Sequence, residues 1–549
     1  MIKKLPDSIS ELIHLRNLNV SRTRVESLPT WISKLRNLQT LNASTESLRQ
    51  LPSTLKNLSR LRHLYVCHGV ELPAEIGRLT YLQGLKFRVG KDKGYRIEEL
   101  GNLNDLKKLS IYNLEKVKDK EEAQKAKISQ KRKLTELSFE WDADRKGEVK
   151  NAEAVLDNLE PHSGVKMLKI AGFKGTAFPS WVQKMAHGDG SLIGGLIEIT
   201  LSGCQGCEKI PELGQLPNLK ILSLRRLSRV RRINSQFYGN INVGGDSFPA
   251  LETLLLTGMF ELEKIEDAGQ KGRRVFPRLK SLKIYGCHKL ECLPSWLFDK
   301  ALGLKEMDVR NCSKLSALPD HLDNLNSLES LTIKGCQNLK SIVNPESRRE
   351  LTSLCSLEIR ECQKLTDIVE SHAPSLKKVS LVELKSLGNI SKFLDTLGQY
   401  SPLLAQLTIV GVPTFISYYE KWRFNNLRKL EIGVSMEWSS RISDAMKKKT
   451  VDFMLQSCRR SSLGELKLTG LEIWDALPKS IPHLTAALYS LELENFGVTE
   501  LPKWFEGLSC LKKLCLIKFS KVDTSALDEA LHRIAGAPHM QLSKNKYGI

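Results

Sequence analysis

The residues with the chemistry for catalysis or metal binding are spread thinly along this sequence of 549 residues. Twelve cysteines and eleven histidines occur, and Cys204 and Cys207 form the one C-x-x-C pair. A structural zinc site would call for a second such pair or a nearby pair of histidines, and the sequence has neither. Buried thiols are therefore the favoured interpretation of these cysteines, and zinc binding is the alternative.

Known catalytic motifs are also missing from the sequence. It contains no G-x-x-x-x-G-K-[ST] phosphate-binding loop, no H-E-x-x-H zinc helix, no G-x-S-x-G nucleophile elbow and no protein-kinase motif set. The histidines, cysteines and acidic residues also lack the compact spacing of a metal site or a catalytic triad. The sequence thus predicts a protein that is not an enzyme, with no catalytic residues, no cofactor and no bound metal.

Charge is the more informative property of the composition. Lys and Arg number 83 against 62 Asp and Glu, which gives a net charge of +21 at pH 7. A hydrophobic content of 41% is enough to bury a core and excludes a disordered chain. No apolar run approaches the ~18 residues of a membrane span, and no signal peptide opens the sequence. A cytoplasmic location without membrane contact is expected, and the nucleus remains open as a second location.

A short leucine pattern recurs through the whole sequence and explains its length. The pattern L-x-x-L-x-[aliphatic or Phe] occurs twenty times, with small variations, first at Leu15 and last at Leu511. The mean spacing is about 26 residues, which lies in the range of a leucine-rich repeat. Because the fourth and sixth positions of a copy alternate along a strand, both point inward while their neighbours face solvent. The sequence predicts an α/β repeat solenoid, a leucine-rich-repeat arc of about 20 repeats with a parallel β-sheet on the concave face and irregular turns and short helices on the convex face.

Two other residue types recur at fixed positions in the copies. Tryptophans follow the proline of a Leu-Pro or Phe-Pro turn by two residues, where outer-face core packing is favoured over ligand stacking: Trp31, Trp181, Trp296 and Trp504. Cysteines occur eight residues after the first position of a copy, where a small buried thiol fits: Cys204, Cys287, Cys312, Cys336 and Cys362.

The period and its interruptions divide the sequence into six expected segments. They are amino-terminal repeats over 1–113 with a truncated first repeat, a helical insertion over 114–133, central repeats over 134–435, a helical basic insertion over 436–462, last repeats over 463–519, and a capping helix with a tail over 520–549. Leu527, Leu531 and Ile534 have the spacing of the capping helix. Because the sequence opens in the middle of a repeat, we expect it to be the carboxyl-terminal part of a longer protein.

The basic insertion has two features of its own. Met446, Phe453 and Met454 form an apolar stripe at helical spacing, and clusters of positive charge occupy 447–449 and 459–460. A solvated helix face is favoured over a nuclear-import signal for these clusters.

The positive charge is concentrated at the solvent-facing strand positions of the first five copies, where no Asp or Glu occurs. These positions define the basic patch, the candidate partner-binding surface: Arg16, Arg22, Arg62, His63, Tyr65, Lys86, Arg88, Lys107, Lys108 and Tyr112. His68 belongs to the same run. Equivalent positions from Leu219 to Arg360 carry both signs of charge.

A basic concave surface can bind an acidic protein surface or follow a phosphate backbone. The acidic protein is favoured, because the sequence shows no groove-entering element and no base-stacking platform. A solubility role is the remaining interpretation.

Several longer strings are specific enough to suggest a family. They are NLEKVKDKEEAQKAKISQKRKLTELSFEWD, GCQGCEKIPELGQLPNLKILSL and VFPRLKSLKIYGCHKLECLP. The sequence resembles the repeat region of plant intracellular nucleotide-binding leucine-rich-repeat disease-resistance receptors of the coiled-coil class.

The resemblance implies a non-catalytic recognition module of a plant immune receptor that binds pathogen effectors or effector-modified host proteins. It also implies that the amino-terminal copies restrain a nucleotide-binding module, which this sequence lacks. A substrate-receptor array of a ubiquitin ligase and a basic scaffold binding nucleic acid are the alternative functions.

Overall fold

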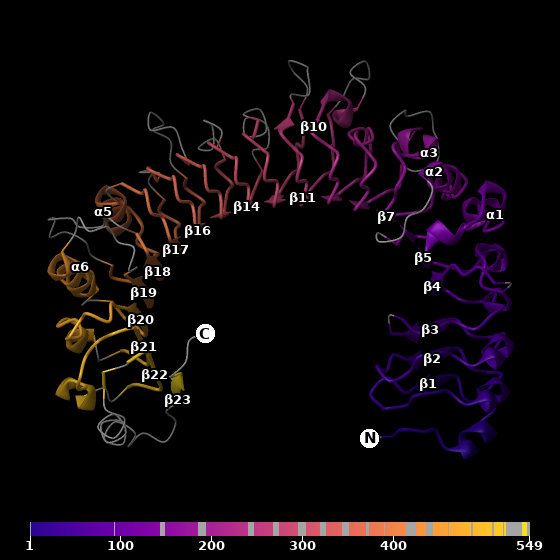
Figure 1. Ribbon diagram of the computed structural model, residues 1–549, viewed down its shortest axis with the longest axis horizontal. Coiled ribbons are helices and arrows are strands. Elements are labelled where there is room, and N and C mark those ends of the chain that lie inside the picture. The colour runs from indigo at the N-terminus through magenta and orange to yellow at the C-terminus, as the bar shows by residue number, and fades with distance from the viewer. Residues whose placement is uncertain are drawn as a thin grey trace. The chain divides into compact units, whose positions relative to one another are not determined.

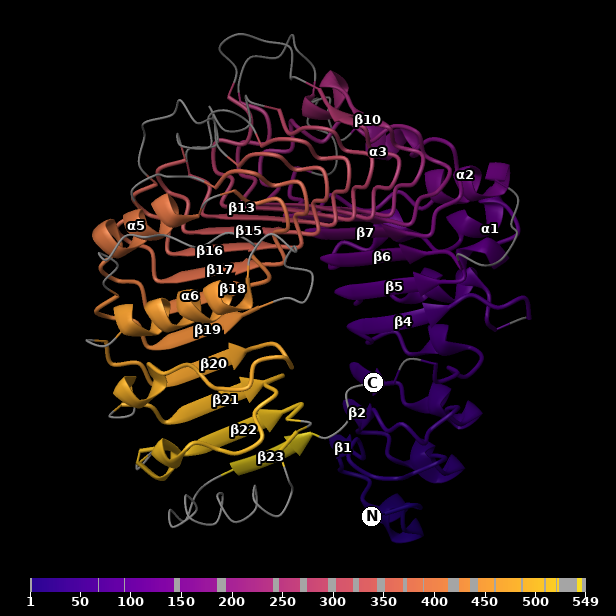
Figure 2. The same ribbon diagram turned by 60° about the vertical axis from the view of Figure 1, so that its left-hand side comes forward.

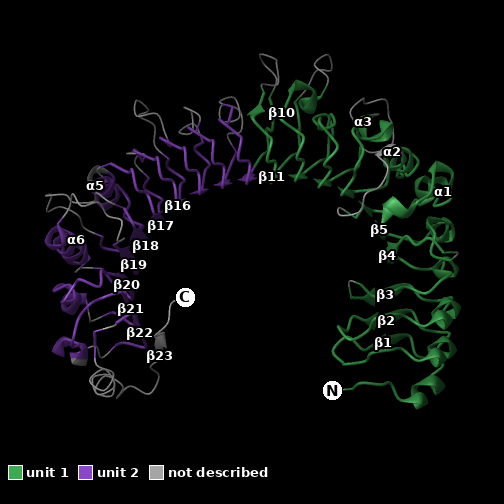
Figure 3. Ribbon diagram, in the orientation of Figure 1, with its two compact units in different colours: residues 1–279 green, residues 280–549 purple. Residues whose placement is uncertain are grey.

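The computed structural model describes residues 2–67, 69–92, 94–142, 149–184, 194–239, 246–266, 274–294, 303–318, 325–342, 351–368, 373–388, 390–412, 424–434, 443–458, 461–484, 487–507, 510–519, 521–522 and 541–545. The chain forms two compact units, residues 1–279 and residues 280–549 (Figure 3). Each unit is built from the same repeating element, a short strand followed by a turn or short helix that leads to the next strand (Figure 1).

The first unit contains two parallel sheets of strands contributed by successive repeats. The smaller sheet has the strands β1 (Asn17–Asn19), β2 (Thr40–Ala43) and β3 (His63–Val66). The larger sheet has the strands β4 (Gly84–Arg88), β5 (Lys108–Tyr112), β6 (Glu136–Glu140), β7 (Met167–Ala171), β8 (Glu198–Ser202), β9 (Ile221–Arg225) and β11 (Thr253–Thr257). Figure 2 shows β4 to β7 stacked side by side. Two shorter strands, β10 (Arg232–Ile233) and β12 (Lys264–Ile265), pair with each other.

The second unit contains one parallel sheet in which every strand pairs with the next along the chain. Its strands are β13 (Ser281–Tyr285), β14 (Glu306–Arg310), β15 (Ser330–Lys334), β16 (Ser356–Arg360), β17 (Lys378–Val382), β18 (Gln406–Val410), β19 (Lys429–Gly433), β20 (Glu465–Thr469), β21 (Ser490–Glu494), β22 (Lys513–Ile517) and β23 (Gln541–Asn545).

The strand register follows the leucine pattern, and the predicted leucine-rich-repeat fold is confirmed. Each of the twenty copies supplies one strand, and the fourth residues of paired copies lie opposite each other, as Leu109 does to Leu137. In β5, for example, Leu109 and Ile111 are 2% and 0% exposed, while Ser110 between them is half-buried. Neighbouring strands satisfy the backbone polar groups, and the stacked leucines form a core that no single repeat could bury.

Turns and short helices make up the other half of each repeat. The 3₁₀ turns are η1 (Asp7–Glu11), η2 (Thr30–Lys34), η3 (Ser53–Asn57), η4 (Ile76–Arg78), η5 (Ile97–Asn102), η6 (Leu114–Lys116), η7 (Ile128–Gln130), η8 (Ser235–Tyr238), η10 (Ile481–Leu484) and η11 (Lys503–Gly507). The α-helices are α1 (Lys120–Gln124), α2 (Val149–Asp157), α3 (Ser180–Lys184), α5 (Ser391–Tyr400) and α6 (Asp444–Ser457). Pro6, Pro29 and Pro52 each directly precede a 3₁₀ turn, where a missing N–H costs nothing. No described helix is both long and apolar enough to cross a membrane.

The helical insertion expected over 114–133 contains more turn than helix. Only α1 is an α-helix, and it begins at a cap in which the Asp119 carboxylate accepts a hydrogen bond of 2.8 Å from the Glu122 N–H. The segment expected over 436–462 contains α6, whose buried face differs from the predicted apolar stripe. Met454 is buried, but Met446 and Phe453 are half-buried. Their places on the buried face are taken by other residues: Lys447, Thr450, Val451 and Leu455.

The charged clusters of this insertion are partly engaged within the fold. Lys447 lies 2.9 Å from the Asp444 carboxylate, and Lys448 lies 2.7 Å from that of Asp475. The second predicted cluster, 459–460, lies outside the described residues.

The end of the chain differs from the expected tail. Residues Gln541–Asn545 form β23, which continues the sheet beyond β22 with Leu542 in register with Leu514. The leucine pattern is absent from this segment, so periodicity does not predict a strand here. The residues predicted to form the capping helix, Leu527, Leu531 and Ile534, lie outside the described residues.

The prediction for the recurring tryptophans is confirmed in full only at Trp181, which is buried and donates its indole N–H to the Leu156 carbonyl at 2.9 Å. Trp31 is half-buried, and its N–H bonds to the Asp7 carboxylate at 2.7 Å. Trp504 is half-buried and stacks on Phe505 with ring centroids 4.4 Å apart. Trp296 lies outside the described residues.

Lys131 is an unusual feature of the core because its charged group has no exposed surface. Its side chain is 0% exposed, and its Nζ donates to the carbonyls of Leu100 and Leu103 at 2.6 and 3.2 Å. These carbonyls lie at the end of η5, where the Leu100 carbonyl also accepts a hydrogen bond from the Leu103 N–H at 3.1 Å. Burial, with a smaller contribution from the nearby Lys127 charge, lowers the pKa of Lys131 to about 8.

This pKa gives the stability of the first unit a dependence on pH. The folded state releases the Lys131 proton near pH 8, whereas the unfolded chain holds it up to about 10.5. Since the unfolded state then binds more protons, the free energy of unfolding should rise between pH 8 and 10.5, by up to about 3 kcal/mol. Denaturant unfolding of the wild type and of Lys131→Met across this range measures the difference. Parallel pH profiles for the two proteins would contradict the prediction.

Candidate partner-binding surface

The structure places the predicted basic patch on and beside strands of both sheets of the first unit. Arg16 and Arg22 flank β1, Arg62 and Lys107 directly precede β3 and β5, and the remaining members lie within β3, β4 and β5: His63, Tyr65, Lys86, Arg88, Lys108 and Tyr112. Tyr65, Lys86 and Arg88 alternate along their strands with inward residues of the leucine pattern, which sets their orientation. His68 lies outside the described residues.

Aromatic side chains lie among these cations. The Arg88 guanidinium carbon is 5.2 Å from the centre of the Tyr112 ring, a cation–π contact that holds both half-buried side chains. The His63 and Tyr65 rings are stacked with centroids 6.2 Å apart, and Tyr65 remains 52% exposed. The patch therefore offers fixed apolar area together with charge.

Most of the positive charge of the patch is not compensated within the protein. Lys108 forms an ion pair of 2.6 Å with Glu136 of β6, the first acidic residue on this face. In the described part of the chain, the other exposed cations of the patch form no ion pair: Arg16, Arg22, Arg62, Lys86 and Lys107.

The second unit shows the opposite arrangement on its strands. Asp308 accepts hydrogen bonds from the Arg310 guanidinium at 2.7 and 2.9 Å and from the Tyr285 hydroxyl at 2.7 Å. Further pairs join cations and carboxylates of the same or neighbouring strands: Lys283 with Glu306, Lys305 with Glu329, Arg360 with Glu358, and Lys467 with Glu492. In the described structure, Lys377, Arg428 and Lys512 beside these strands form no ion pair either, so what distinguishes β1 to β5 is that these strands contain no Asp or Glu.

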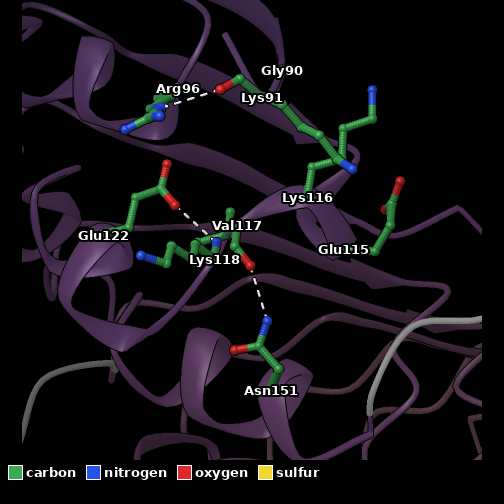
Figure 4. Close-up of a pocket in the computed structure, with 9 residues that line it drawn as sticks. All are labelled: Gly90, Lys91, Arg96, Glu115, Lys116, Val117, Lys118, Glu122 and Asn151. Atoms are coloured by element: carbon green, nitrogen blue, oxygen red, sulfur yellow. Dashed lines mark hydrogen bonds between the residues drawn. The ribbon is translucent and has the colours of Figure 1, made fainter. Parts of the chain in front are cut away.

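A hollow in the first unit lies beyond the ends of β4 and β5 and has a volume of about 540 Å³ (Figure 4). Its polar groups mostly satisfy one another. Asn151 donates to the Val117 carbonyl at 2.9 Å, Arg96 donates to the Lys91 carbonyl at 3.2 Å, and the Lys118 N–H donates to the Glu122 carboxylate at 2.8 Å. These hydrogen bonds give the hollow a structural role, because they hold α1 and α2 against the repeats.

Eight of the twelve cysteines are buried thiols, including all those at the recurring repeat position. Cys204 and Cys207 are both 0% exposed, and burial raises the pKa of Cys204 to about 12. The cysteines at the recurring repeat position are buried as well: Cys287, Cys312, Cys336 and Cys362. A zinc ligand must be a thiolate, which this burial opposes. Among the described residues, no group of three or more His, Cys, Asp or Glu side chains could hold a metal ion.

Thiol reactivity should follow this burial. We expect the exposed Cys292 and Cys510 to react first with Ellman's reagent at pH 8, and the buried thiols to react only after unfolding. Stopped-flow absorbance in buffer and in guanidinium measures the two phases. Fast labelling of Cys312 or Cys336 in the native protein, detected by mass spectrometry, would contradict this.

Comparisons with known proteins agree with the repeat pattern. The family described as R13L1/DRL21 leucine-rich repeats matches residues 97–227. The chain is 31% identical over 276 residues to the putative disease resistance protein RGA1 of Solanum bulbocastanum, covering 49% of this chain and 27% of the relative. It is 31% identical over 269 residues to the putative disease resistance RPP13-like protein 1 of Arabidopsis thaliana, covering 46% and 25%. Among solved structures, a leucine-rich-repeat protein of Leptospira interrogans aligns over 99% of both chains at 16% identity, with a TM-score of 0.37.

The expected resemblance to the leucine-rich-repeat region of plant disease-resistance proteins is thereby confirmed. The chain spans about a quarter of the length of the relatives it matches. In such proteins these repeats are a non-catalytic module, in agreement with the sequence prediction.

Proposed function

We propose that this chain, with the repeats of a plant disease-resistance protein, is the recognition module of an immune receptor. It binds pathogen effectors or host proteins that effectors have modified, and its basic patch holds an acidic surface of the receptor's nucleotide-binding module. The single observation that carries this proposal is the run of exposed cations on and beside β1 to β5 that form no ion pair in the described structure, on strands that contain no Asp or Glu. The receptor would act in the cytoplasm, and nuclear entry remains a second location.

An acidic protein suits this patch better than a nucleic acid. Tyr65 is the one aromatic member of the patch that is exposed, since Tyr112 is half-buried under Arg88. Single-strand binding sites present several aromatic rings on which successive bases stack. A protein surface needs only complementary charge and some apolar contact. No described feature of the chain favours a ubiquitin-ligase array over the immune role.

The binding test uses the nucleotide-binding module of the RGA1 relative as the partner, purified separately from the chain of residues 1–549. We expect a complex at about 50 mM NaCl that weakens steeply with added salt, because attraction between exposed charges is screened. A twenty-nucleotide single strand should fail to compete. Absence of a complex at low salt, or equal binding of the oligonucleotide, would contradict the proposed function.

A further inference from the structure

The strand ladder of the first unit is interrupted in the middle of the basic patch. Strands β3 and β4 belong to different sheets, although they come from successive repeats (Figure 1). One backbone hydrogen bond joins their starts, from the Gln83 N–H to the Arg62 carbonyl at 2.9 Å. At the next repeat, the N–H groups of Lys107 and Lys108 both bond to the Gln83 carbonyl, and a full ladder follows. Strand β4 therefore separates from β3 after a single bond.

This separation opens the core between the two repeats. Leu64 and Val66 of β3 are half-buried, whereas residues at the same positions in β5 are fully buried. Leu72, in the segment after β3, is half-buried as well. These side chains line a cleft of about 600 Å³ that runs between β3 and β4. Aliphatic side chains left open to water in this way favour contact with another apolar group.

The rim of the cleft is positively charged. Lys86 and Lys107 line it and form no ion pair in the described structure. Lys108 also lines it, together with its partner Glu136, the only acidic residue of the lining. An apolar floor within a cationic rim matches a ligand that carries an apolar side chain between carboxylates.

The backbone of the cleft also has unused pairing capacity. Beyond their first bond, β3 and β4 share no ladder in the described structure, so their facing edges present N–H and C=O groups to the cleft. Such edges pair readily with an extended peptide. Gly84 stands at the start of β4, and a Cβ added to it would meet no atom within 4 Å.

We propose that the cleft between β3 and β4 binds an extended acidic peptide segment of a protein partner. One aliphatic or aromatic side chain of the segment packs on Leu64, Val66 and Leu72, and its carboxylates lie against Lys86 and Lys107. This inference rests on the proposed function, which supplies an acidic protein partner, and adds that recognition uses an inserted segment. A nucleic acid strand would match the rim but not the aliphatic floor.

The test measures fluorescence anisotropy of a labelled probe peptide, Glu-Asp-Leu-Glu-Phe-Asp-Glu, with the chain of residues 1–549. A second peptide has alanine in place of Leu and Phe, and a third has lysine in place of every acidic residue. We expect the first to bind at least about tenfold more tightly than the second, because the second has no large apolar side chain to pack on the floor of the cleft. The third should not bind. Equal binding of the first two peptides would overturn the proposal.

Two variants locate the site. Gly84→Phe places its ring in the cleft, where a Cβ added at position 84 meets no atom within 4 Å, and should weaken the probe at least about tenfold. Gly194→Phe is the matched control, since Gly194 also has no atom within 4 Å of an added Cβ and lies outside the cleft lining. It should bind like the wild type. Lys86→Glu, an exposed change with little bearing on folding, should also weaken the probe. Wild-type binding by Gly84→Phe and Lys86→Glu would overturn the proposal.

Gly84→Phe and the double reversal of Arg16 and Arg22 to glutamate separate failure of this inference from failure of the proposed function. If Gly84→Phe leaves binding of the nucleotide-binding module unchanged while reversal of Arg16 and Arg22 to glutamate abolishes it, the basic patch stands and the cleft is refuted. If neither change affects that binding, the proposed function falls as well.

Discussion

Replacement of Arg62, Lys86 and Lys107 together by glutamate is expected to weaken binding of the nucleotide-binding module at least about a hundredfold at low salt. Each of these side chains is exposed and lacks an ion pair in the described structure. The change therefore places three negative charges opposite an acidic partner, where like-charge contact costs several kcal/mol. Titration calorimetry at about 50 mM NaCl measures the loss, and above about 1 M NaCl the difference from wild type should nearly vanish.

A matched reversal in the second unit controls for net charge. Lys283, Lys305 and Lys334 are paired with carboxylates at 2.9, 2.7 and 3.5 Å. Their replacement by glutamate changes the net charge by the same amount as the reversal of Arg62, Lys86 and Lys107. Surface pairs of this kind contribute roughly 0–1 kcal/mol to stability, so the fold should persist. We expect binding to fall less than about threefold in this control. An equal loss in both variants would show that general charge, and not the basic patch, attracts the partner.

The strands could be predicted from the sequence because local pattern and global packing agree. Leu109 and Ile111 alternate with polar residues, and only stacking on identical neighbours buries them. The same alternation gave the direction of each member of the basic patch. The repeat pattern also predicts the ion pair between Lys108 and Glu136. Both residues hold the third position of their copies, so they lie opposite each other on neighbouring strands. No single copy shows this ion pair, because it joins the third positions of two neighbouring copies.

The cleft and the last strand could not be predicted from that pattern. Leu64 and Val66 fit the repeat as well as any inward pair, yet they are half-buried. The separation of β3 from β4 depends on the path of the connecting chain, which side-chain periodicity does not describe. The interval from Leu61 to Leu82, the shortest between successive copies, and Gly84 at the start of β4 were the available signals. Strand β23 forms because β22 offers it an open edge, with no leucine pattern of its own.

Replacement of Phe248 by alanine is expected to lower the free energy of unfolding of the first unit by about 3–5 kcal/mol. Phe248 is 0% exposed and packs against Phe237 and Phe276, with ring centroids 4.9 Å away in both cases. Tyr238 joins this cluster through contacts with Phe237 and Phe276. Aromatic pairs of this kind add about 0.5–1.5 kcal/mol to the area that they bury.

The backbone at Phe248 limits how far the site can relax. Its φ is +52°, and its N–H bonds to the Gly214 carbonyl in a neighbouring repeat. A non-glycine residue adopts this conformation only where the surroundings impose it, so alanine keeps the strain and loses the contacts that offset it. The cavity should therefore remain largely open, which places the expected loss at the upper end of the range for core substitutions.

Because neighbouring repeats stabilise each other, the loss should appear as unfolding of the repeats on both sides of Phe248. Guanidinium unfolding gives its size, and hydrogen exchange should show reduced protection in β9 and β11. Phe260→Ala is the matched control, since Phe260 is 45% exposed and should change stability by less than about 1 kcal/mol. Equal losses for the two variants, or unchanged protection of β9 in Phe248→Ala, would show that the aromatic cluster does not hold these repeats together.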